Sequence, residues 1–221
     1  MEVREAIRER RSIRHFLPKP VAGELIQAII AESLWAPSWG NTQPWEIVVV
    51  TGEKLEQFKK KNQSALLAGK ASNPDIPMPQ VWPDTYMMRY KELGKGVLAA
   101  LSITREDKKA RLQHFARMFA LFEAPVVILV MVDKELAREY AMLDVGIFLQ
   151  TFCLLAHDRG LGTCILAASV NYPEIVRELF AVAENKILVM GASLGWPDTD
   201  APVNRFERKR GSLEEFVKWL R

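Results

Sequence analysis

Residues 136–160, LAREYAMLDVGIFLQTFCLLAHDRG, have the spacing of one long helix that is apolar on most sides in its middle. A helix that is hydrophobic nearly all round must be covered on more than one side. We therefore expect this helix in the core or at a subunit interface, in a fold that supplies that cover. The longest unbroken apolar run, residues 124–132, is far shorter than the roughly 20 residues that a bilayer span needs, so we expect no membrane segment.

The remaining elements favour the α+β class. β-Branched and apolar stretches predict strands at 45–52, 124–133, 161–169 and 186–198. Helical spacing predicts further helices at 2–10, 23–35, 53–69, 84–105, 107–122 and 172–180. Helices and strands alternate irregularly, which argues against a doubly wound parallel sheet. Because no repeat or composition shift marks a boundary, we expect one domain over residues 1–221.

One segment interrupts this pattern. Residues 71–83, ASNPDIPMPQVWP, contain four prolines in thirteen positions, which excludes a regular helix. Long loops of this kind in compact domains are usually lids or binding loops. We therefore expect a lid-like excursion that includes residues 71–122.

Composition excludes several classes of function. The 30 basic and 27 acidic residues give a net charge of +3, which is too balanced for binding nucleic acid or membranes through overall charge. Cys153 and Cys164 lie in apolar stretches without CxxC or Cys/His spacing, so we expect neither a disulfide nor a metal site. Free thiols, and an amino terminus without the apolar core of a signal peptide, favour the cytoplasm.

Basic residues are concentrated in two segments. The first basic segment, RERRSIRHF at 8–16, surrounds one serine with four arginines, and the second, RFERKR, covers 205–210. Guanidinium groups packed so closely repel one another unless an anion lies among them. One interpretation is an anion site, and the other is a solvated helix end whose basic side chains complement the helix dipole.

Three patterns that imitate catalytic motifs do not fit their required context. GASLG at 191–195 matches the nucleophile elbow of α/β-hydrolases, but Trp196 and Pro197 prevent the helix that must follow the serine, and no histidine comes after it. GKGVLA at 94–99 follows a helical stretch instead of a strand, so a dinucleotide site is not supported. The histidines lack acidic or cysteine partners at ligand spacing and are assigned no role: His15, His114 and His157.

The loop at 36–45, APSWGNTQPW, combines two prolines, two tryptophans and the amides of Asn41 and Gln43. Its side chains and backbone could donate and accept hydrogen bonds along the edge of a planar heteroaromatic ring, while the prolines hold the loop's shape. The alternative is a structural turn that ends the preceding helix.

Four motifs together resemble one known family. They are RRSIRHF at 10–16, APSWGNTQPW at 36–45, GLGTC at 160–164, and GASLGWPD at 191–198 with the trailing NRFERKR. Their order is similar to that of the FMN-dependent nitroreductase family, and they cover nearly the whole chain. Three further segments look most like its nitroaromatic and nitrobenzoate reductase branch: 105–111, 172–180 and 194–206. The resemblance implies a central mixed or antiparallel sheet surrounded by helices, in a homodimer with composite active sites.

The resemblance implies that the two basic segments bind FMN together. A dianionic phosphate among guanidinium forks removes their repulsion, because bidentate N–H groups neutralise it. Arg208 and Arg210 match the family's late phosphate-binding pair, and Arg14 would stabilise the reduced flavin at its pyrimidine edge. The first segment contributes Arg10, Arg11, Ser12 and Arg14.

Two other segments complete the flavin site that the resemblance implies. One approaches the flavin from the neighbouring subunit, so that only the dimer is active: Pro37, Ser38, Trp39 and Asn41. The other flanks the isoalloxazine ring as a strand, where small residues allow close backbone approach: Ile165, Leu166, Ala167 and Ala168.

The implied reaction is ping-pong, with NADH or NADPH reducing FMN before a nitroaromatic or related acceptor takes its place. No side chain is needed as acid or base. Residues that could stack on an aromatic acceptor or pair with its carboxylate are Trp82, Tyr86, Arg89, Phe119 and Phe122. The alternative is that these aromatics anchor a lid. Met118 replaces an amide that is frequent in the branch, which implies a less polar acceptor site.

Two rival interpretations remain open at the level of the sequence. One keeps the FMN scaffold and changes the acceptor to a flavin, a quinone, an enone or a halogenated aromatic. The other is a noncatalytic module whose basic segments bind nucleic acid or another phosphate ligand.

Overall fold

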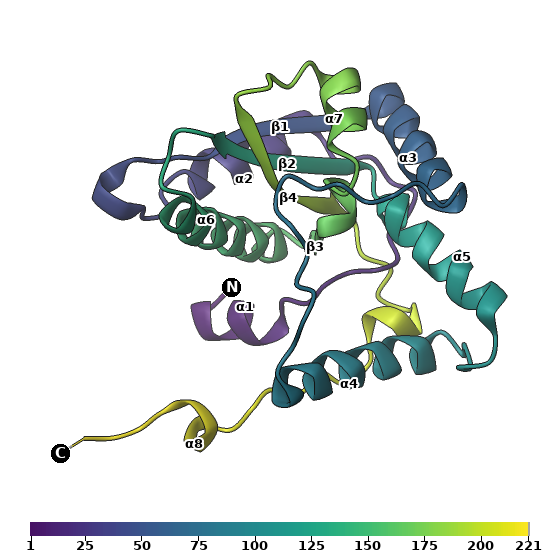
Figure 1. Cartoon of the computed structure of the whole chain (residues 1–221). Coiled ribbons are helices and arrows are strands. Elements are labelled where there is room, and N and C mark those ends of the chain that lie inside the picture. The colour runs from purple at the N-terminus through teal and green to yellow at the C-terminus, as the bar shows by residue number, and fades with distance from the viewer. Residues whose placement is uncertain (221) are drawn as a thin grey trace.

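The computed structural model describes residues 1–220 and has three layers, with a four-stranded sheet between two sets of helices (Figure 1). The strand order is β1-β2-β4-β3, and every neighbouring pair is antiparallel. The strands are β1 (Glu46–Thr51), β2 (Val126–Asp133), β3 (Gly162–Leu166) and β4 (Lys186–Gly195). The expected α+β class is confirmed, and this sheet is antiparallel, not mixed.

Strand β2 separates two hydrophobic cores. Val127 and Leu129 belong to one core, whereas Ile128 and Val130 belong to the other. Successive side chains of a strand point to opposite faces, so an unbroken apolar strand must be covered on both sides. The run VVILVMV therefore forces helices onto both faces of the sheet.

The helices supply that cover. One core is packed by α3 (Gly52–Leu67), α5 (Lys108–Phe119) and α7 (Pro173–Phe180). The other is packed by α2 (Gly23–Ser33) and α6 (Arg138–Asp158). The remaining helices are α1 (Val3–Glu9), α4 (Asp84–Ala100) and α8 (Leu213–Phe216). Short 3-10 turns lie at Trp39–Asn41, Leu121–Glu123, Ala167–Ser169 and Pro202–Asn204.

Helix α6 is the long apolar helix expected from the sequence. Among the described residues it is the one helix whose length and composition would let it cross a bilayer, and 44% of its apolar window is buried inside the protein. Phe148 and Phe152 are fully buried in the core beneath the sheet. Asp144, which is 2% exposed, accepts a hydrogen bond of 3.1 Å from the Trp39 backbone. These contacts make α6 a core helix of this domain.

The excursion after α3 has two parts. Residues 71–83 contain no regular helix or strand, as their prolines predict, and α4 then runs at a distance from the sheet (Figure 1). Helix α5 returns to the body and packs against α3.

Asp75 fixes the proline-rich loop to the body of the protein. Its carboxylate accepts hydrogen bonds of 3.3 and 2.8 Å from Arg177 of α7, and one of 2.8 Å from the backbone of Leu188. The Arg177 guanidinium also donates to the Lys186 carbonyl at 2.9 Å. Both side chains are mostly buried, with 18% and 12% exposed.

We expect Asp75→Asn to lower the free energy of unfolding by about 2–3 kcal/mol, because it leaves a largely buried guanidinium with only the exposed Glu184 as its countercharge. Urea unfolding measures this loss, and limited proteolysis should cut residues 71–83 faster. The matched control is Asp84→Asn at the exposed start of α4, which should change stability by less than about 0.5 kcal/mol. Equal stability of the two variants would contradict the prediction.

Candidate active site

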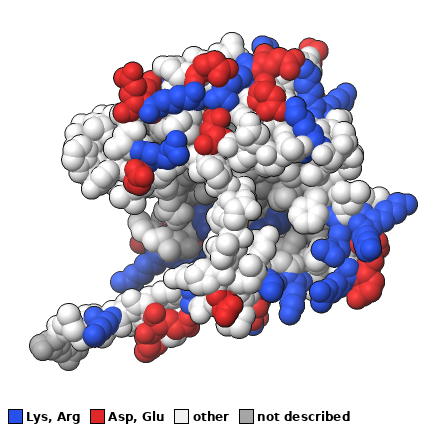
Figure 2. Space-filling model, viewed as in Figure 1, with Lys and Arg blue, Asp and Glu red and all other residues white. Residues whose placement is uncertain are grey.

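A cavity of about 1120 Å³ lies between the body and α4. Its walls come from three stretches that are far apart in the sequence: the first basic segment, one face of α4, and residues 206–216. Figure 2 shows Lys and Arg atoms at the back of the hollow between the body and the α4 layer. The α4 residues on this wall recur at intervals of three and four, as on one helix face: Thr85, Met88, Arg89, Glu92, Leu93, Lys95 and Gly96.

The two basic segments meet at this cavity. The Arg208 guanidinium donates hydrogen bonds to the carbonyl oxygens of Arg10 and Arg8, across 198 and 200 positions of sequence. The first segment is held against the sheet by a hydrogen bond of 2.9 Å from the Ile13 backbone to Thr163 of β3. The arginine cluster defined by these contacts and the cavity wall consists of Arg10, Arg11, Arg14, Arg208 and Arg210.

The arginine cluster has no ion-pair partner in the described part of the chain, although Glu92, Glu207 and Glu215 line the same cavity. None of its five members takes part in an ion pair there. Burial, followed by the nearby Arg11, Arg210 and Arg10, lowers the pKa of Arg208 from its ordinary value. The buried Nε atom of Arg10 has no hydrogen-bond partner. A site that disfavours its own cations and leaves a donor unused suits a dianionic phosphate.

The same positive field extends to α5. His114 has a lowered pKa, caused first by burial and then by the positive charges of Arg14 and Arg117. Its imidazole is therefore neutral at physiological pH and adds no charge to the site. Its ring lies 6.0 Å from that of Phe122, centroid to centroid. The structure gives His114 no contact that requires a catalytic role.

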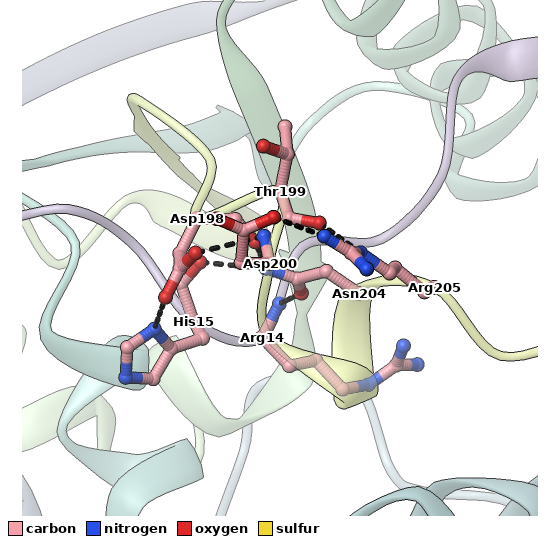
Figure 3. A network of polar contacts seen from close by, with 7 residues as sticks. All are labelled: Arg14, His15, Asp198, Thr199, Asp200, Asn204 and Arg205. Atoms are coloured by element: carbon pink, nitrogen blue, oxygen red, sulfur yellow. Dashed lines mark hydrogen bonds and ion pairs between the residues drawn. The ribbon is translucent and has the colours of Figure 1, made fainter.

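A polar network fixes the backbone beneath the arginine cluster (Figure 3). The Arg14 backbone donates to Asn204 Oδ1 at 2.7 Å, and Asn204 Nδ2 donates to the carbonyls of His15 and Asp198, each at 2.8 Å. His15 Nδ1 lies 3.0 Å from the Asp198 carboxylate. The Arg14 guanidinium projects toward the cavity and lies 5.8 Å from the centre of the Phe206 ring.

The loop at 36–45 forms a turn away from this cavity. The Gln43 backbone donates to Ser38 Oγ at 2.9 Å, and Asn41 adopts a positive φ of 58°. Trp39 is 66% exposed and lies 5.6 Å from Tyr140 of α6, between ring centroids. None of Pro37, Ser38, Trp39 and Asn41 lines the cavity of its own chain.

The segment 165–168 departs from the predicted strand. β3 ends at Leu166, and Ala167–Ser169 form a 3-10 turn closed by a 2.6 Å hydrogen bond from Ser169 Oγ to the Leu166 carbonyl. The strand prediction for 167–169 is wrong because this local side-chain bond competes with the ladder. Ile165 is 41% exposed, whereas Leu166 and Ala168 are each only 6% exposed. A ligand at this edge would therefore meet Ile165 and main-chain groups.

The acceptor candidates fall into two groups. Arg89 lines the cavity, pairs with Glu215 and stacks on Phe216 with 5.0 Å to the ring centre. Tyr86 and Trp82 are exposed on and before the same helix, although neither lines the cavity. The structure does not bring Phe119 and Phe122 there, since they are 7% and 2% exposed inside the core that packs against α3.

We expect both cysteines to be unreactive in the folded protein. Burial raises the pKa of Cys153, and it raises the pKa of Cys164 to about 11. At pH 8 only about one Cys164 in a thousand is a thiolate, and neither sulfur is open to reagent. Titration with a thiol-reactive disulfide should label no cysteine before urea is added. Lys109→Cys, on an exposed face of α5, supplies the fast-reacting control, and equally fast labelling without it would contradict the prediction.

Sequence reasoning missed two contributors to the site. The apolar residues Met88 and Leu93 of α4 and Phe206 of the second basic segment line the cavity. The second contributor, Asn204, is the first residue of the NRFERKR segment. Its position directly before the second basic segment offered a weak signal, because one buried amide is not distinguishable from a surface amide in a single sequence.

An antiparallel sheet covered on both faces, with a cluster of arginines without ion pairs at a large cavity, defines an α+β protein whose cavity suits a phosphate ligand. The profile of the Nitroreductase family matches residues 7–196. The nitrobenzene nitroreductase of Ectopseudomonas oleovorans is 34% identical over 220 residues, with 98% of this chain and 96% of the relative covered. The 4-nitrobenzoate reductase of Pseudomonas putida is 33% identical, with 97% and 93% covered.

A solved structure agrees over the full length. The FMN and NADPH-dependent nitroreductase NfnB from sphigopyxis sp. strain HMH has a TM-score of 0.95 and 31% identity, with 100% of this chain and 99% of that chain covered. This chain belongs to the nitroreductase family. The resemblance to the nitroaromatic and nitrobenzoate reductase branch is likewise confirmed.

Proposed function

We propose that this protein is an FMN-dependent NAD(P)H oxidoreductase that reduces nitroaromatic acceptors. One observation carries the proposal: five arginines from the two ends of the chain gather at one cavity, and none of them forms an ion pair within the described residues. The names of the full-length relatives support the acceptor class, and the solved relative supports FMN and NADPH. A noncatalytic phosphate-binding module has no comparable support.

The arginine cluster would hold the FMN phosphate. Arg10, Arg208 and Arg210 supply guanidinium donors to it, together with Ser12, and Arg11 reinforces the positive field. Arg14 lies toward Phe206 and would face the pyrimidine edge of the flavin. A bound FMN would supply the hydride-transfer chemistry between the nicotinamide and the acceptor, in ping-pong order. The chain's own residues bind, orient and polarise, and no side chain is required as acid or base.

The active unit in this proposal is a homodimer. Trp39, Tyr140 and Leu143 are 66%, 54% and 61% exposed, and they continue into an apolar depression on α6 that includes Met142 and Ile147. Exposed aromatic and aliphatic side chains on this scale mark an interaction surface. The loop of Pro37, Ser38, Trp39 and Asn41, which its own cavity does not use, would then complete the partner's flavin site.

The acceptor would bind between the flavin and α4. Arg89, flanked by Tyr86 and Phe216, offers a cation and aromatic faces to a ring that bears a nitro or carboxylate group. Met118, which stands where the family branch often has an amide side chain, packs against the core. This replacement therefore does not change the α4 wall of the cavity. Residues 1–221 would act as one domain with the excursion at 71–122 as its lid, and the free buried thiols suit the cytoplasm.

Anaerobic reduction of the purified, FMN-loaded protein tests the proposal. NADPH or NADH should bleach the visible flavin absorption, and adding 4-nitrobenzoate or nitrobenzene should restore it. A parallel screen with free flavin, quinone, an enone and halogenated tyrosine ranks the alternative acceptors. Protein that neither retains FMN nor takes it up on reconstitution would overturn the proposal, and flavin reoxidised by quinone but not by nitroaromatics would overturn the acceptor class.

A further inference from the structure

Asn204 links the two basic segments through hydrogen bonds to the main chain. Its side chain is 4% exposed, and all of its hydrogen-bonding capacity toward the first segment is directed at backbone groups. Oδ1 accepts from the Arg14 backbone at 2.7 Å, while Nδ2 donates to His15 O at 2.8 Å. The second proton of the amide goes to Asp198 O, also at 2.8 Å. Its own carbonyl accepts from the Arg11 guanidinium.

These bonds lie where both walls of the phosphate site begin. Arg11 and Arg14 are anchored directly, and the chain continues from Asn204 to Phe206 and Arg208, which line the same cavity. Figure 3 shows the Asn204 side chain between the backbone of Arg14 and the loop at Asp198, with the Arg14 guanidinium projecting away from it. Of the two basic segments, the side chain of Asn204 bonds only the first, at Arg14 and His15, so losing it would displace the Arg14 guanidinium first.

Asparagine fits this junction in a way that similar residues do not. The three partners require one hydrogen-bond acceptor and two donors on a short planar group, and a carboxamide provides these groups. An aspartate would turn an oxygen toward the carbonyls of His15 and Asp198, where the amide now donates. A serine offers a single hydroxyl and cannot reach all three partners.

The neutrality of Asn204 matters for the same reason. The pKa of Arg208 is lowered first by burial and then by the positive charges of Arg11, Arg210 and Arg10, so the arginines of the cluster repel one another. An acidic residue at this position would hold the arginines together but would also neutralise part of the charge that attracts a phosphate. The amide fixes the backbone and leaves the charge of the cluster available.

We propose that Asn204 is a positioning residue for the FMN site, which sets the place of the Arg14 guanidinium by binding the Arg14 and His15 main chain without supplying a countercharge. This inference rests on the proposed FMN function. Asn204 would thus contribute to the affinity for FMN although it is buried away from the cavity and need not touch the cofactor.

A double-mutant cycle on FMN affinity tests this role. Asn204→Ser and Arg14→Met should each weaken FMN binding by about 10- to 30-fold, as expected when a charged hydrogen bond is lost or misaligned. Because Asn204 acts through Arg14, the double variant should bind FMN about as weakly as the weaker single variant. The midpoint potential of bound FMN should also fall in Asn204→Ser, since the cation moves from the pyrimidine edge.

Two controls separate positioning from general stability. Asn185→Ser makes the same chemical change at an exposed amide that binds Asp133, and it should leave FMN affinity and potential unchanged. Asp75→Asn destabilises the fold far from the cluster and should do the same. Asn204→Asp, which keeps the shape of the side chain, provides a second variant if Asn204→Ser does not fold, and it should weaken FMN binding at least as much.

The outcomes are distinct. Losses of FMN affinity that multiply in the double variant, or an equal loss in Asp75→Asn, would assign Asn204 a general structural role and overturn the inference. The inference would also be overturned if both Asn204 variants bound FMN within twofold of the wild-type affinity and left the midpoint potential of bound FMN unchanged. Wild-type protein that does not bind FMN would instead overturn the proposed function.

Discussion

Arg208→Met is expected to weaken FMN binding at least about 100-fold, because truncating one partner of a desolvated, charge-assisted contact costs several kcal/mol. Arg208 is the residue that joins the two basic segments, through its hydrogen bonds to the carbonyls of Arg8 and Arg10. Its loss removes a phosphate donor and also the hydrogen bonds that hold the second basic segment against the carbonyls of Arg8 and Arg10. Fluorescence titration of the apoprotein with FMN measures the change.

The matched control for this variant is Arg205→Met. Arg205 lies three positions earlier in the same segment, is exposed, and bonds Thr199 and Asp200 instead of the cavity. We expect Arg205→Met to bind FMN within about threefold of the wild-type affinity, because salt screens an exposed charge that does not line the cavity. Unchanged affinity in Arg208→Met, or an equal loss in Arg205→Met, would contradict the assignment of the phosphate site.

Gly162→Ala is expected to lower the free energy of unfolding by about 1–3 kcal/mol, the usual cost of forcing an extra methyl group into a packed core. A Cβ at position 162 would lie 2.4 Å from Ile13 Cγ1 and 3.2 Å from Pro197 Cβ. Both neighbours belong to segments that carry the arginine cluster and its anchor. The variant should therefore lose FMN affinity together with stability, as measured by urea unfolding and FMN titration.

The control glycine is Gly94 in α4. A Cβ there meets nothing within 4 Å, and its φ is not positive. In a helix interior, alanine is favoured over glycine by up to about 1 kcal/mol, so Gly94→Ala should be neutral or more stable. If Gly162→Ala has the same free energy of unfolding as the wild type, Ile13 does not pack against Gly162 of β3 as closely as the structure shows.

Much of the fold followed from local patterns in the sequence. The unbroken apolar strand at 124–133 predicted a central strand covered on both faces, and the four prolines at 71–83 predicted a loop. Where the structure differs from the sequence prediction, the cause is a contact that the spacing of residues in the sequence does not reveal. The turn at 167–169 depends on the Ser169 hydroxyl, which bonds a neighbouring carbonyl and ends the strand.

The site was only partly predictable. Repulsion between the arginines argued that an anion joins the two basic segments, and the structure brings Arg10 and Arg208 into contact. The burial of Phe119 and Phe122 was not readable, because an aromatic residue at the end of a helix suits a core as well as a binding site. Asn204 shows the same limit, since its role comes from three main-chain partners that only the folded chain assembles.

The most direct test of the central claim compares FMN with riboflavin, which lacks the phosphate, by titrating each into the wild-type apoprotein. If the arginines from both ends of the chain bind the phosphate, FMN should bind at least about 100-fold more tightly than riboflavin, and added salt should narrow the difference. Equal affinity for the two flavins would contradict the claim.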